Sequence, residues 1–220
     1  MAQSEAATKI QTFWNSRYGE KGYTYGTEPN DFLASAVANH IPASLPASGN
    51  ADALFVGDGE GRNGVWMATQ GFKVTSVDLS DIGMAKAAAL AKERGTSITT
   101  HVADLSTFDL GEGKWDVIVS IFCHMPSASR NPLNQRIMRA LKPNGYVIME
   151  AYSPQQRGQG TGGPQDLDML PSMDSLMQDF SVESGAMKVL HKWEGKRLVV
   201  EGTHHTGEGY VNQLVLQKTA

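Results

Sequence analysis

The stretch from Leu54 to Ser80 constrains the fold of this chain more than any other. It opens with a short apolar run that leads directly into a glycine-rich turn, Gly57-Asp58-Gly59-Glu60-Gly61. A helix-like segment follows up to Gly71, and a second strand-like run ends at Asp78. This order predicts a strand–turn–helix–strand unit with two neighbouring parallel strands. Such a unit binds a small molecule at its turn, beyond the carboxyl ends of the strands.

The rest of the chain continues the alternation of strands and helices. Strands are predicted at 51–56, 73–78, 97–103, 115–122 and 146–151, and helices at 61–70, 80–95, 131–141 and 173–180. Two further strand-like runs, at 186–201 and 210–217, flank a glycine-containing turn and predict an antiparallel hairpin. The predicted fold class is therefore α/β, with a doubly wound, seven-stranded, mostly parallel sheet that ends in a C-terminal antiparallel hairpin.

Local signals also predict where several elements begin and end. Asp31 is expected to cap a helix over 32–39. Asn131 followed by Pro132 is expected to start the helix at 131–141, because proline fits the first helical turn. Residues 142–145 are expected to form a turn before the fifth strand, and residues 202–209 the turn of the hairpin.

Residues 1–50 differ in pattern from the rest and are expected to form a helical and loop extension on a main domain of residues 51–220. A helix is predicted at 4–18, with apolar side chains on one face. The loop at 19–30 contains glycines and tyrosines, which suits a lid that closes over a ligand. An ordinary helical cover explains the same pattern equally well.

Composition narrows the class of partner. The chain of 220 residues is 40% hydrophobic and 19% charged, as in globular proteins. Its net charge of -4 and its lack of a Lys/Arg run argue against nucleic acid or a membrane surface as the main partner. The start of the chain shows no secretory leader, and Cys123 as the single cysteine excludes an intramolecular disulfide. We expect a cytoplasmic protein, monomeric or homodimeric, that acts on a small molecule.

The glycine turn and the acidic strand end indicate the kind of ligand. Gly57, Gly59 and Gly61 lack side chains, so a ligand can approach the backbone closely. The carboxylate of Asp78 can accept hydrogen bonds from both hydroxyls of a ribose, although helix capping is the alternative role. The dinucleotide pattern G-x-G-x-x-G fails when it is counted from Gly57, because Arg62 stands at the sixth position. Counted from Gly59 it reaches Gly64, which is a poor match shifted into the helix.

This spacing of glycines, with an acid that ends the second strand, resembles the class I S-adenosylmethionine-dependent methyltransferases. The sequence Leu-Lys-Pro-Asn-Gly at 141–145 is similar to a family sequence at the same place. The closer resemblance is to small-molecule methyltransferases of the tellurite-resistance type. It rests on Gly-Glu-Gly-Arg-Asn (59–63), Tyr-Gly-Thr-Glu-Pro-Asn (25–30), Cys-His-Met-Pro (123–126), Glu-Ala-Tyr-Ser-Pro (150–154) and Gly-Thr-Gly-Gly-Pro (160–164).

The resemblance implies S-adenosylmethionine as cofactor, S-adenosylhomocysteine as product, and in-line transfer of a methyl group to a small molecule. The acceptor is expected to be a thiol, a metalloid oxyanion or a similar nucleophile, held between the N-terminal extension and the loop at 153–172. The implied cofactor-binding residues are Tyr18, Tyr25, Gly26, Gly57, Asp58, Gly59, Gly61, Asn63, Asp78, Leu79, Ser80, Asp104, Leu105 and Phe122.

One departure from the family lies beneath the turn. Phe55 stands where the family usually has an aspartate, and Asp58 stands where a small residue is usual. We expect Phe55 to weaken the hydrogen bonds under the turn and Asp58 to contact the ammonium group of the methionine moiety.

Three side chains are candidates for the substrate side of the reaction. His124 is either a general base or a hydrogen-bonded loop residue, and Arg62 either binds an anionic acceptor or lies on the surface at a helix start. His205, in the hairpin turn, is expected to face the substrate. Glu150 ends a core strand and needs a partner, for which Arg62 and His205 are the candidates. No metal site is expected, since no third ligand accompanies the histidine pair at 204–205.

Two other functions remain open. An NAD(P)-dependent oxidoreductase would use a similar turn, but the Arg62 mismatch, the terminal hairpin and the absence of a Tyr-x-x-x-Lys pair argue against it. A non-catalytic nucleotide-binding module is the third possibility, with Phe55 as the mark of an altered site.

Overall fold

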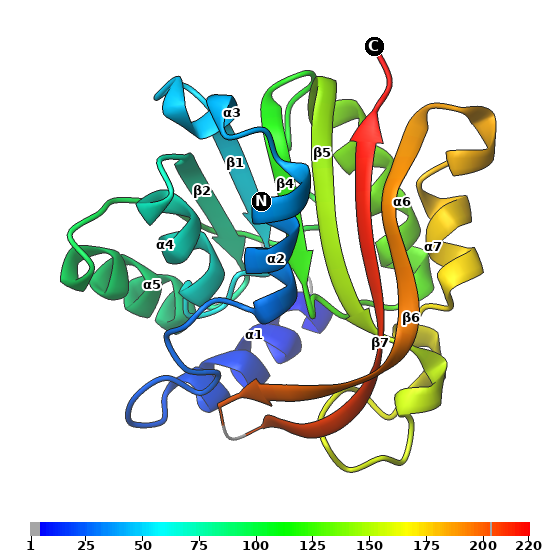
Figure 1. Ribbon diagram of the computed structural model, residues 1–220. Coiled ribbons are helices and arrows are strands. Elements are labelled where there is room, and N and C mark those ends of the chain that lie inside the picture. Colours follow the sequence, from blue (N-terminus) through cyan, green and yellow to red (C-terminus); the bar gives the residue numbers. More distant parts are fainter. Residues whose placement is uncertain (1–4, 203) are drawn as a thin grey trace.

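The computed structural model describes residues 5–202 and 204–220, which form one seven-stranded sheet with helices on both faces (Figure 1). The strand order is β3-β2-β1-β4-β5-β7-β6. The strands are β1 (Asp52–Val56), β2 (Lys73–Asp78), β3 (Thr99–Val102), β4 (Trp115–Ile121), β5 (Leu141–Tyr152), β6 (Met187–Glu201) and β7 (His205–Lys218). β7 runs antiparallel to both of its neighbours, whereas β1 to β5 are parallel. The predicted fold class and the C-terminal hairpin are therefore confirmed.

The helices are α1 (Glu5–Tyr18), α2 (Asp31–His40), α3 (Ser44–Ala47), α4 (Arg62–Thr69), α5 (Asp81–Glu93), α6 (Ser127–Ala140) and α7 (Met173–Asp179). Short 3-10 turns lie at Pro154–Gln156, Leu167–Met169 and Val182–Ser184.

The core has two layers because successive strand residues point to opposite faces of the sheet. In β1, Leu54 packs with Ile137 of α6 and Leu176 of α7. Its neighbour Phe55 packs on the other face with Leu33 of α2 and Met67 of α4. The near-continuous apolar sequence of this strand follows from its burial on both faces.

The cap of α2 differs from the prediction. Asn30, rather than Asp31, is the N-cap residue, and its side-chain oxygen accepts a hydrogen bond from the backbone N–H of Leu33 at 2.9 Å. Asn30 has the extended backbone that a cap requires, whereas Asp31 is already helical. Asn30 and Asp31 are both residues that can cap a helix. Asn30 takes the cap position, and it is completely buried there.

The start of α6 was also predicted wrongly. The helix begins at Ser127, so Pro132 lies in its interior instead of its first turn. A proline there removes one helical hydrogen bond. Tertiary contacts with α7 compensate, because Arg130 and Asn134 both bind the carboxylate of Asp179, at 2.8 and 3.1 Å.

Two predicted turns are shorter or absent. Residues 142–145 belong to β5 and form a bulge, since Leu141 pairs with Trp115 whereas Tyr146 pairs with Val117. The hairpin turn is also shorter than 202–209, because β6 and β7 stay paired up to Glu201 and His205. Pairing of β7 with β5 stops earlier, at Tyr152. The end of the hairpin therefore extends beyond the sheet, where it curves toward the side of β1 and β2 (Figure 1).

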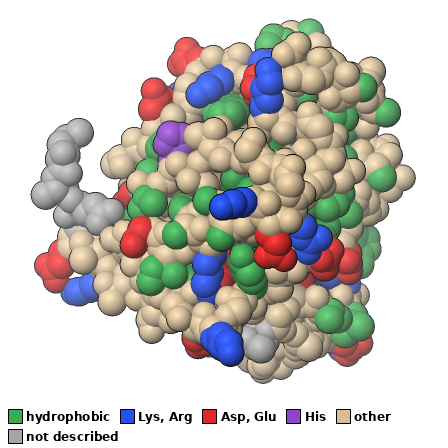
Figure 2. All heavy atoms as spheres, turned by 90° about the vertical axis from the view of Figure 1, so that its left-hand side faces the viewer, with side chains coloured by type: hydrophobic (Ala, Val, Ile, Leu, Met, Phe, Trp, Pro, Cys, Tyr) green, Lys and Arg blue, Asp and Glu red, His purple; other side chains and the backbone are tan. Residues whose placement is uncertain are grey.

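The surface carries mixed charges. On the face shown in Figure 2, basic and acidic side chains are interspersed over α4 and α5. Within the part of the chain that the structure describes, no helix is both long and apolar enough to cross a membrane.

Candidate functional site

Asp78 lies at the carboxyl end of β2, directly against the glycine turn. One of its carboxylate oxygens accepts a hydrogen bond from the N–H of Gly59, and the other from the N–H of Ser80, both at 2.9 Å. Burial raises the pKa of Asp78, while the hydrogen bonds from Ser80, Gly59 and Leu79 lower it. These contacts fix the carboxylate at the edge of the sheet where a ligand of an α/β protein binds.

The glycine turn depends on its missing side chains. Gly57, Gly59 and Gly61 have φ values of 67°, 60° and 85°, which favour glycine. A Cβ on Gly57 would lie 2.6 Å from the Sγ of Cys123, and one on Gly59 would lie 2.5 Å from the Tyr18 hydroxyl. The turn is thus enclosed by α1 and by the segment after β4. Bare backbone beside a buried carboxylate fits the ribose and amino-acid parts of an adenosylated amino acid.

Asp58 belongs to this turn, and its side chain is hydrogen-bonded to neighbouring elements. Its carboxylate accepts hydrogen bonds from the Ser76 hydroxyl at 2.7 Å and from the Gly64 N–H at 3.3 Å. Phe55 is 2% exposed and packs in the core. Asp58 therefore makes hydrogen bonds at the turn that Phe55 cannot make, and its contact with the ammonium group of the cofactor stays a prediction.

The other residues implied to bind the cofactor lie around the same edge. Ser80 caps α5 through Gly83 and donates to Asn15 of α1 at 2.6 Å, with the half-buried Leu79 beside it. Asp104 forms a turn after β3 by accepting from Ser106 at 2.8 Å, and the next residue, Leu105, is buried.

Two more of the implied residues, Gly26 and Asn63, lie near the segment that connects α1 to α2. Gly26 has a φ of 76° in the loop between these helices. Asn63 accepts a hydrogen bond from the N–H of Asn30 at 2.9 Å, which joins α4 to the start of α2.

Five rings form an aromatic cluster beyond β4 and β5: Tyr25, Phe122, His124, Tyr152 and His205. The rings of Phe122 and Tyr152 stack with centroids 4.6 Å apart, and those of Tyr152 and His205 meet edge-on at 5.3 Å. Tyr25 lies 4.6 Å from His205. Phe122 adopts a φ of 52°, a left-handed conformation that is uncommon for a bulky residue.

The two histidines of this cluster are neutral but differ in their contacts. The Nε2 of His124 accepts a hydrogen bond from the Tyr152 N–H at 3.0 Å, and burial lowers the pKa of His124 to about 4. Its lone pair is therefore already used. Burial also lowers the pKa of His205 to about 3, and its Nδ1 has no hydrogen-bond partner among the described residues.

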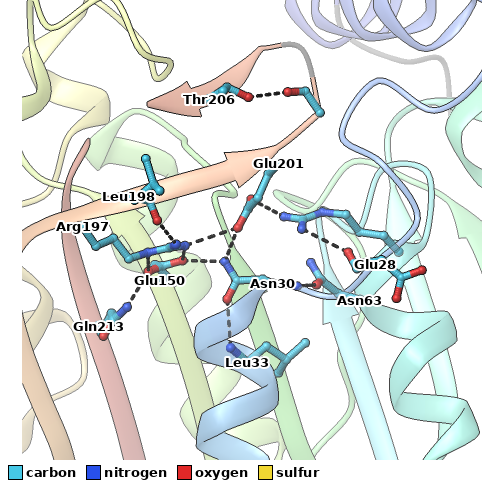
Figure 3. A network of polar contacts seen from close by, with 12 residues as sticks. Glu28, Asn30, Leu33, Asn63, Glu150, Arg197, Leu198, Glu201, Thr206 and Gln213 are labelled. Carbon is cyan, nitrogen blue, oxygen red and sulfur yellow. Dashed lines mark hydrogen bonds and ion pairs between the residues drawn. The ribbon is translucent and has the colours of Figure 1, made fainter. Parts of the chain in front are cut away.

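Figure 3 shows a buried charged network, and its glutamates Glu150 and Glu201 lie close enough to Tyr152 of the aromatic cluster to raise the pKa of that residue. Glu150 is completely buried and forms a two-pronged ion pair with Arg197, at 2.6 and 2.8 Å. Arg62 pairs with Glu201 at 2.5 Å, and Asn30 donates to both glutamates, at 2.6 and 2.7 Å. The expected pairing of Glu150 with Arg62 or His205 is thus wrong, because the hairpin brings Arg197 to it. Arg62 is 8% exposed and already paired with a carboxylate.

Sequence reasoning did not assign roles to Asn30, Tyr152, Arg197 and Glu201. Asn30 and Tyr152 stand within segments that carried the family resemblance, which was a usable signal. Arg197 and Glu201 lie in a strand without a distinctive pattern, and only the path of the hairpin brings them to this edge.

Comparison with known proteins supports this assignment of the fold. Residues 53–145 match the family described as "Methyltransferase domain". The chain is 24% identical to a ubiquinone biosynthesis O-methyltransferase of Rickettsia akari (strain Hartford), over 70% of this chain and 61% of that protein. A second such enzyme, from Rickettsia conorii, is 30% identical over 46% of this chain and 34% of its own length. The chain thus spans less than two thirds of these curated relatives.

Solved structures with the same fold are more distant in sequence. A protein studied for the conversion of a disulfide bond into a thioacetal group during echinomycin biosynthesis has a TM-score of 0.74 and 16% identity, over 98% of this chain and 92% of that chain. TehB from Haemophilus influenzae has a TM-score of 0.66 and 15% identity, over 95% and 67%.

The N-methyltransferase NodS from Bradyrhizobium japonicum WM9, in complex with S-adenosylhomocysteine, has a TM-score of 0.67 and 12% identity, over 96% of this chain and 98% of that chain. These likenesses establish the fold, and the family match covers the segment from β1 to the bulge of β5. Residues 53–145 therefore match the methyltransferase family, and the fold of the chain is that of the class I methyltransferases.

Proposed function

We propose that this protein transfers a methyl group from S-adenosylmethionine to a small-molecule acceptor. The cofactor supplies an electrophilic methyl group on a sulfonium, and the residues of this chain bind and align the two reactants. Alignment of reactants is a major source of rate enhancement in such displacements. The acceptor site is the aromatic cluster, which lies beside the glycine turn and at the carboxyl ends of β4 and β5.

The observation that carries this proposal is the contact of Asp78 with Gly59. The N–H of the central glycine of the turn donates to the carboxylate at 2.9 Å, which joins the bare backbone and the acidic strand end into one site. In this site Asp78 holds the ribose, the backbone of the glycine turn lies toward the amino-acid part, and Asp104 with Leu105 lies toward the base.

The sheet argues against the oxidoreductase alternative. The dinucleotide-binding fold has the strand order 3-2-1-4-5-6. In this chain, an antiparallel strand stands between β5 and β6. Counted from Gly57, the dinucleotide pattern has Arg62 at its sixth position, and counted from Gly59 its last glycine, Gly64, lies inside α4. Together with this poor match, the sheet favours the methyltransferase function.

Calorimetric titration with S-adenosylhomocysteine and, separately, with NADH tests the proposal. We expect the wild-type protein to bind S-adenosylhomocysteine and not NADH. Asp78→Asn removes a charged acceptor, so the affinity for S-adenosylhomocysteine should fall about 10- to 100-fold, which corresponds to about 1.5–3 kcal/mol. Circular dichroism should show that this variant is folded.

Asp109→Asn is the matched control, because Asp109 is an exposed aspartate that accepts a backbone hydrogen bond from Gly111. Its affinity should equal that of the wild type. Failure of the wild-type protein to bind S-adenosylhomocysteine would leave the non-catalytic alternative. Unchanged binding by Asp78→Asn would refute the role of Asp78 in holding the ribose.

A further inference from the structure

β6 is the last strand of the sheet, so one of its two edges has no neighbouring strand (Figure 1). The strand runs over 15 residues, from Met187 to Glu201, and its ladder is formed with β7. Within the described part of the chain, the backbone of residues 188–200 makes one hydrogen bond outside this ladder, from the Arg197 side chain to the carbonyl of Leu198 at 3.0 Å. An unpaired edge of this length is a surface that another strand can join.

The side chains of β6 restrict which strand can join it. Lys188, Lys192 and Lys196 lie along the strand, and a bulge between Val189 and His191 interrupts its regular pairing. Lysines and bulges are usual devices by which proteins prevent nonspecific pairing of edge strands. The regular stretch after the bulge begins at Lys192. A strand that joins this stretch needs an acidic side chain opposite the lysines, because like charges directly opposite each other are destabilising.

The sequence of β6 is complementary to itself in this respect. In antiparallel pairing about Gly195, the exposed Glu194 of one copy lies opposite the exposed Lys196 of the other, and symmetry forms the same pair twice. Lys192 then lies opposite Leu198, which is 62% exposed, so the stem of the lysine covers an apolar side chain. Pairing about Glu194 or about Lys196 sets that charge against its own copy. Pairing about position 193 meets the bulge almost at once.

Gly195 and Trp193 suit the centre of such a pair. A Cβ on Gly195 would lie 2.5 Å from the Cζ2 of Trp193, so the glycine leaves the room that the indole ring occupies. The side chain of Trp193 is 38% exposed. Pairing about Gly195 sets the two glycines opposite each other, and the two indole rings that lie over them meet at the twofold axis. Apolar surface that was in contact with water is buried there.

Lys196 can form the additional ion pair without losing its present contacts. Its ammonium group contacts Glu208 of β7 at 2.5 Å and lies 5.8 Å from the centroid of the Tyr210 ring. An ammonium group has three N–H donors, so it can bind Glu208 and Glu194 of a second copy at the same time. Because these charged side chains are exposed, the pairing requires no rearrangement of the core.

We propose that two copies of this chain associate through antiparallel pairing of their β6 edges about Gly195, which joins two seven-stranded sheets into one. The interface is isologous, since the same surface of each copy contacts the other. It contains none of the residues that hold the cofactor in the proposed function. The association and the methyl transfer can therefore each fail without the other.

Sedimentation velocity over protein concentrations from about 1 to about 300 µM tests the association. We expect the wild-type protein to form a dimer with a micromolar dissociation constant. Glu194→Lys should raise this constant at least about tenfold, because two attractive pairs become two repulsive pairs. Lys196→Glu should have the same effect. The double variant, Glu194→Lys with Lys196→Glu, exchanges the two charges and should restore the wild-type constant within about threefold.

Lys192→Glu is the matched control. It makes the same change of charge as Lys196→Glu on the same exposed strand, but at a position that lies opposite Leu198. Its dissociation constant should stay within about threefold of the wild-type value. This control also separates the registers, because pairing about position 193 would set Lys192 against Glu194. All variants should keep the far-ultraviolet circular dichroism of the wild type, since the changed side chains are exposed.

Wild-type protein that stays monomeric at the highest concentration would overturn the proposal and leave the β6 edge to a strand of another protein. A dimer whose dissociation constant is unchanged in Glu194→Lys would also overturn it, because the interface then lies elsewhere. If the double variant does not recover, the pairing of Glu194 with Lys196 is wrong. Sedimentation requires no S-adenosylhomocysteine, so a failure of the proposed function, which calorimetry detects, is seen separately.

Discussion

Asp58 shows how a single residue of the glycine turn can be tied to two neighbouring elements. Asp58 is half-buried, and its carboxylate accepts hydrogen bonds from Ser76 and Gly64. Burial raises the pKa of Asp58 from 3.8 to about 7, and the nearby carboxylate of Asp78 raises it as well. The two hydrogen bonds lower it but do not offset the burial. The turn of this domain therefore contains an acid that titrates near neutral pH.

This shift predicts a pH-dependent stability. Because the folded-state pKa lies above the unfolded value, the stabilisation from the bound proton is complete below about pH 4 and is lost as the pH rises through about 7. Asp58→Asn cannot lose that proton, so it should gain stability relative to the wild type over this range. The gain should exceed about 1.4 kcal/mol, the free energy of one pKa unit. Urea denaturation at a series of pH values from about 4.5 to about 8 measures this gain in unfolding free energy.

Glu194→Gln is the control for this experiment, since Glu194 is an exposed carboxylate on β6. Its difference in unfolding free energy from the wild type should stay constant with pH. A pH-independent difference for Asp58→Asn would contradict the raised pKa.

At the scale of elements, the start of α2 is the junction of several distant segments. Asn30 caps the helix through Leu33 and donates to Glu150 at the end of β5 and to Glu201 at the end of β6. Figure 3 shows these contacts meeting at one asparagine. The hairpin carries Arg197 and Glu201 to this point, and Arg62 brings in the start of α4. The buried charges hold the four elements in one arrangement.

This junction predicts a large effect of a conservative change. Asn30→Asp keeps a residue that caps helices well. It also replaces the amide donor with a third carboxylate next to Glu150 and Glu201. We expect a loss of about 3–5 kcal/mol in unfolding free energy, the usual cost of an uncompensated buried charge. Urea denaturation at neutral pH checks this value.

Ser172→Asp is the matched comparison, because Ser172 is an exposed cap that accepts from the N–H of Ser175. Aspartate there should change stability by less than about 1 kcal/mol, since both residues cap well. If Asn30→Asp changed the unfolding free energy as little as Ser172→Asp does, the hydrogen bonds of Asn30 to the two glutamates would not contribute to the stability of the fold.

At the scale of the whole molecule, residues 5–50 share the core of the sheet. Phe32, Leu33 and Ala36 of α2 belong to the same buried cluster as Phe55 of β1. At the other end of this segment, Tyr18 of α1 is 5% exposed and lies on the glycine turn. The role of this segment as a lid stays a prediction, but its packing couples it to the folding of the sheet.

We therefore expect one cooperative unfolding transition. Leu33→Ala, at a residue with 0% exposure, should lower the unfolding free energy by about 2–5 kcal/mol. Near-ultraviolet and far-ultraviolet circular dichroism should shift together, and calorimetric and van't Hoff enthalpies should agree. Val200→Ala, at a residue with 67% exposure, should leave the transition unchanged. A separate transition of the N-terminal segment would show that it folds independently of the sheet.

The accuracy of the sequence predictions followed the range of the interactions involved. The glycine turn, the acid that ends β2 and the terminal hairpin depend on neighbouring residues and on strand periodicity, and the structure contains all three. Element ends were less accurate where distant contacts decide them. Pro132 lies inside α6, a helix that Asp179 of α7 also binds, and Asn30, the cap of α2, also donates to two glutamates from distant strands.

The sequence by itself determined the class of fold and the position of the glycine turn with Asp78, because local chemistry and hydrophobic periodicity act along the chain. Only the tertiary structure decided what Glu150 pairs with, where Asp58 points, and which polar atoms in the aromatic cluster are unpartnered. Those facts depend on the end of the hairpin crossing the carboxyl edge of the sheet, which sets Arg197 against Glu150 and His205 against Tyr152. Side chains so far apart in sequence leave no periodic signal, and their contacts arise only when the strands pair.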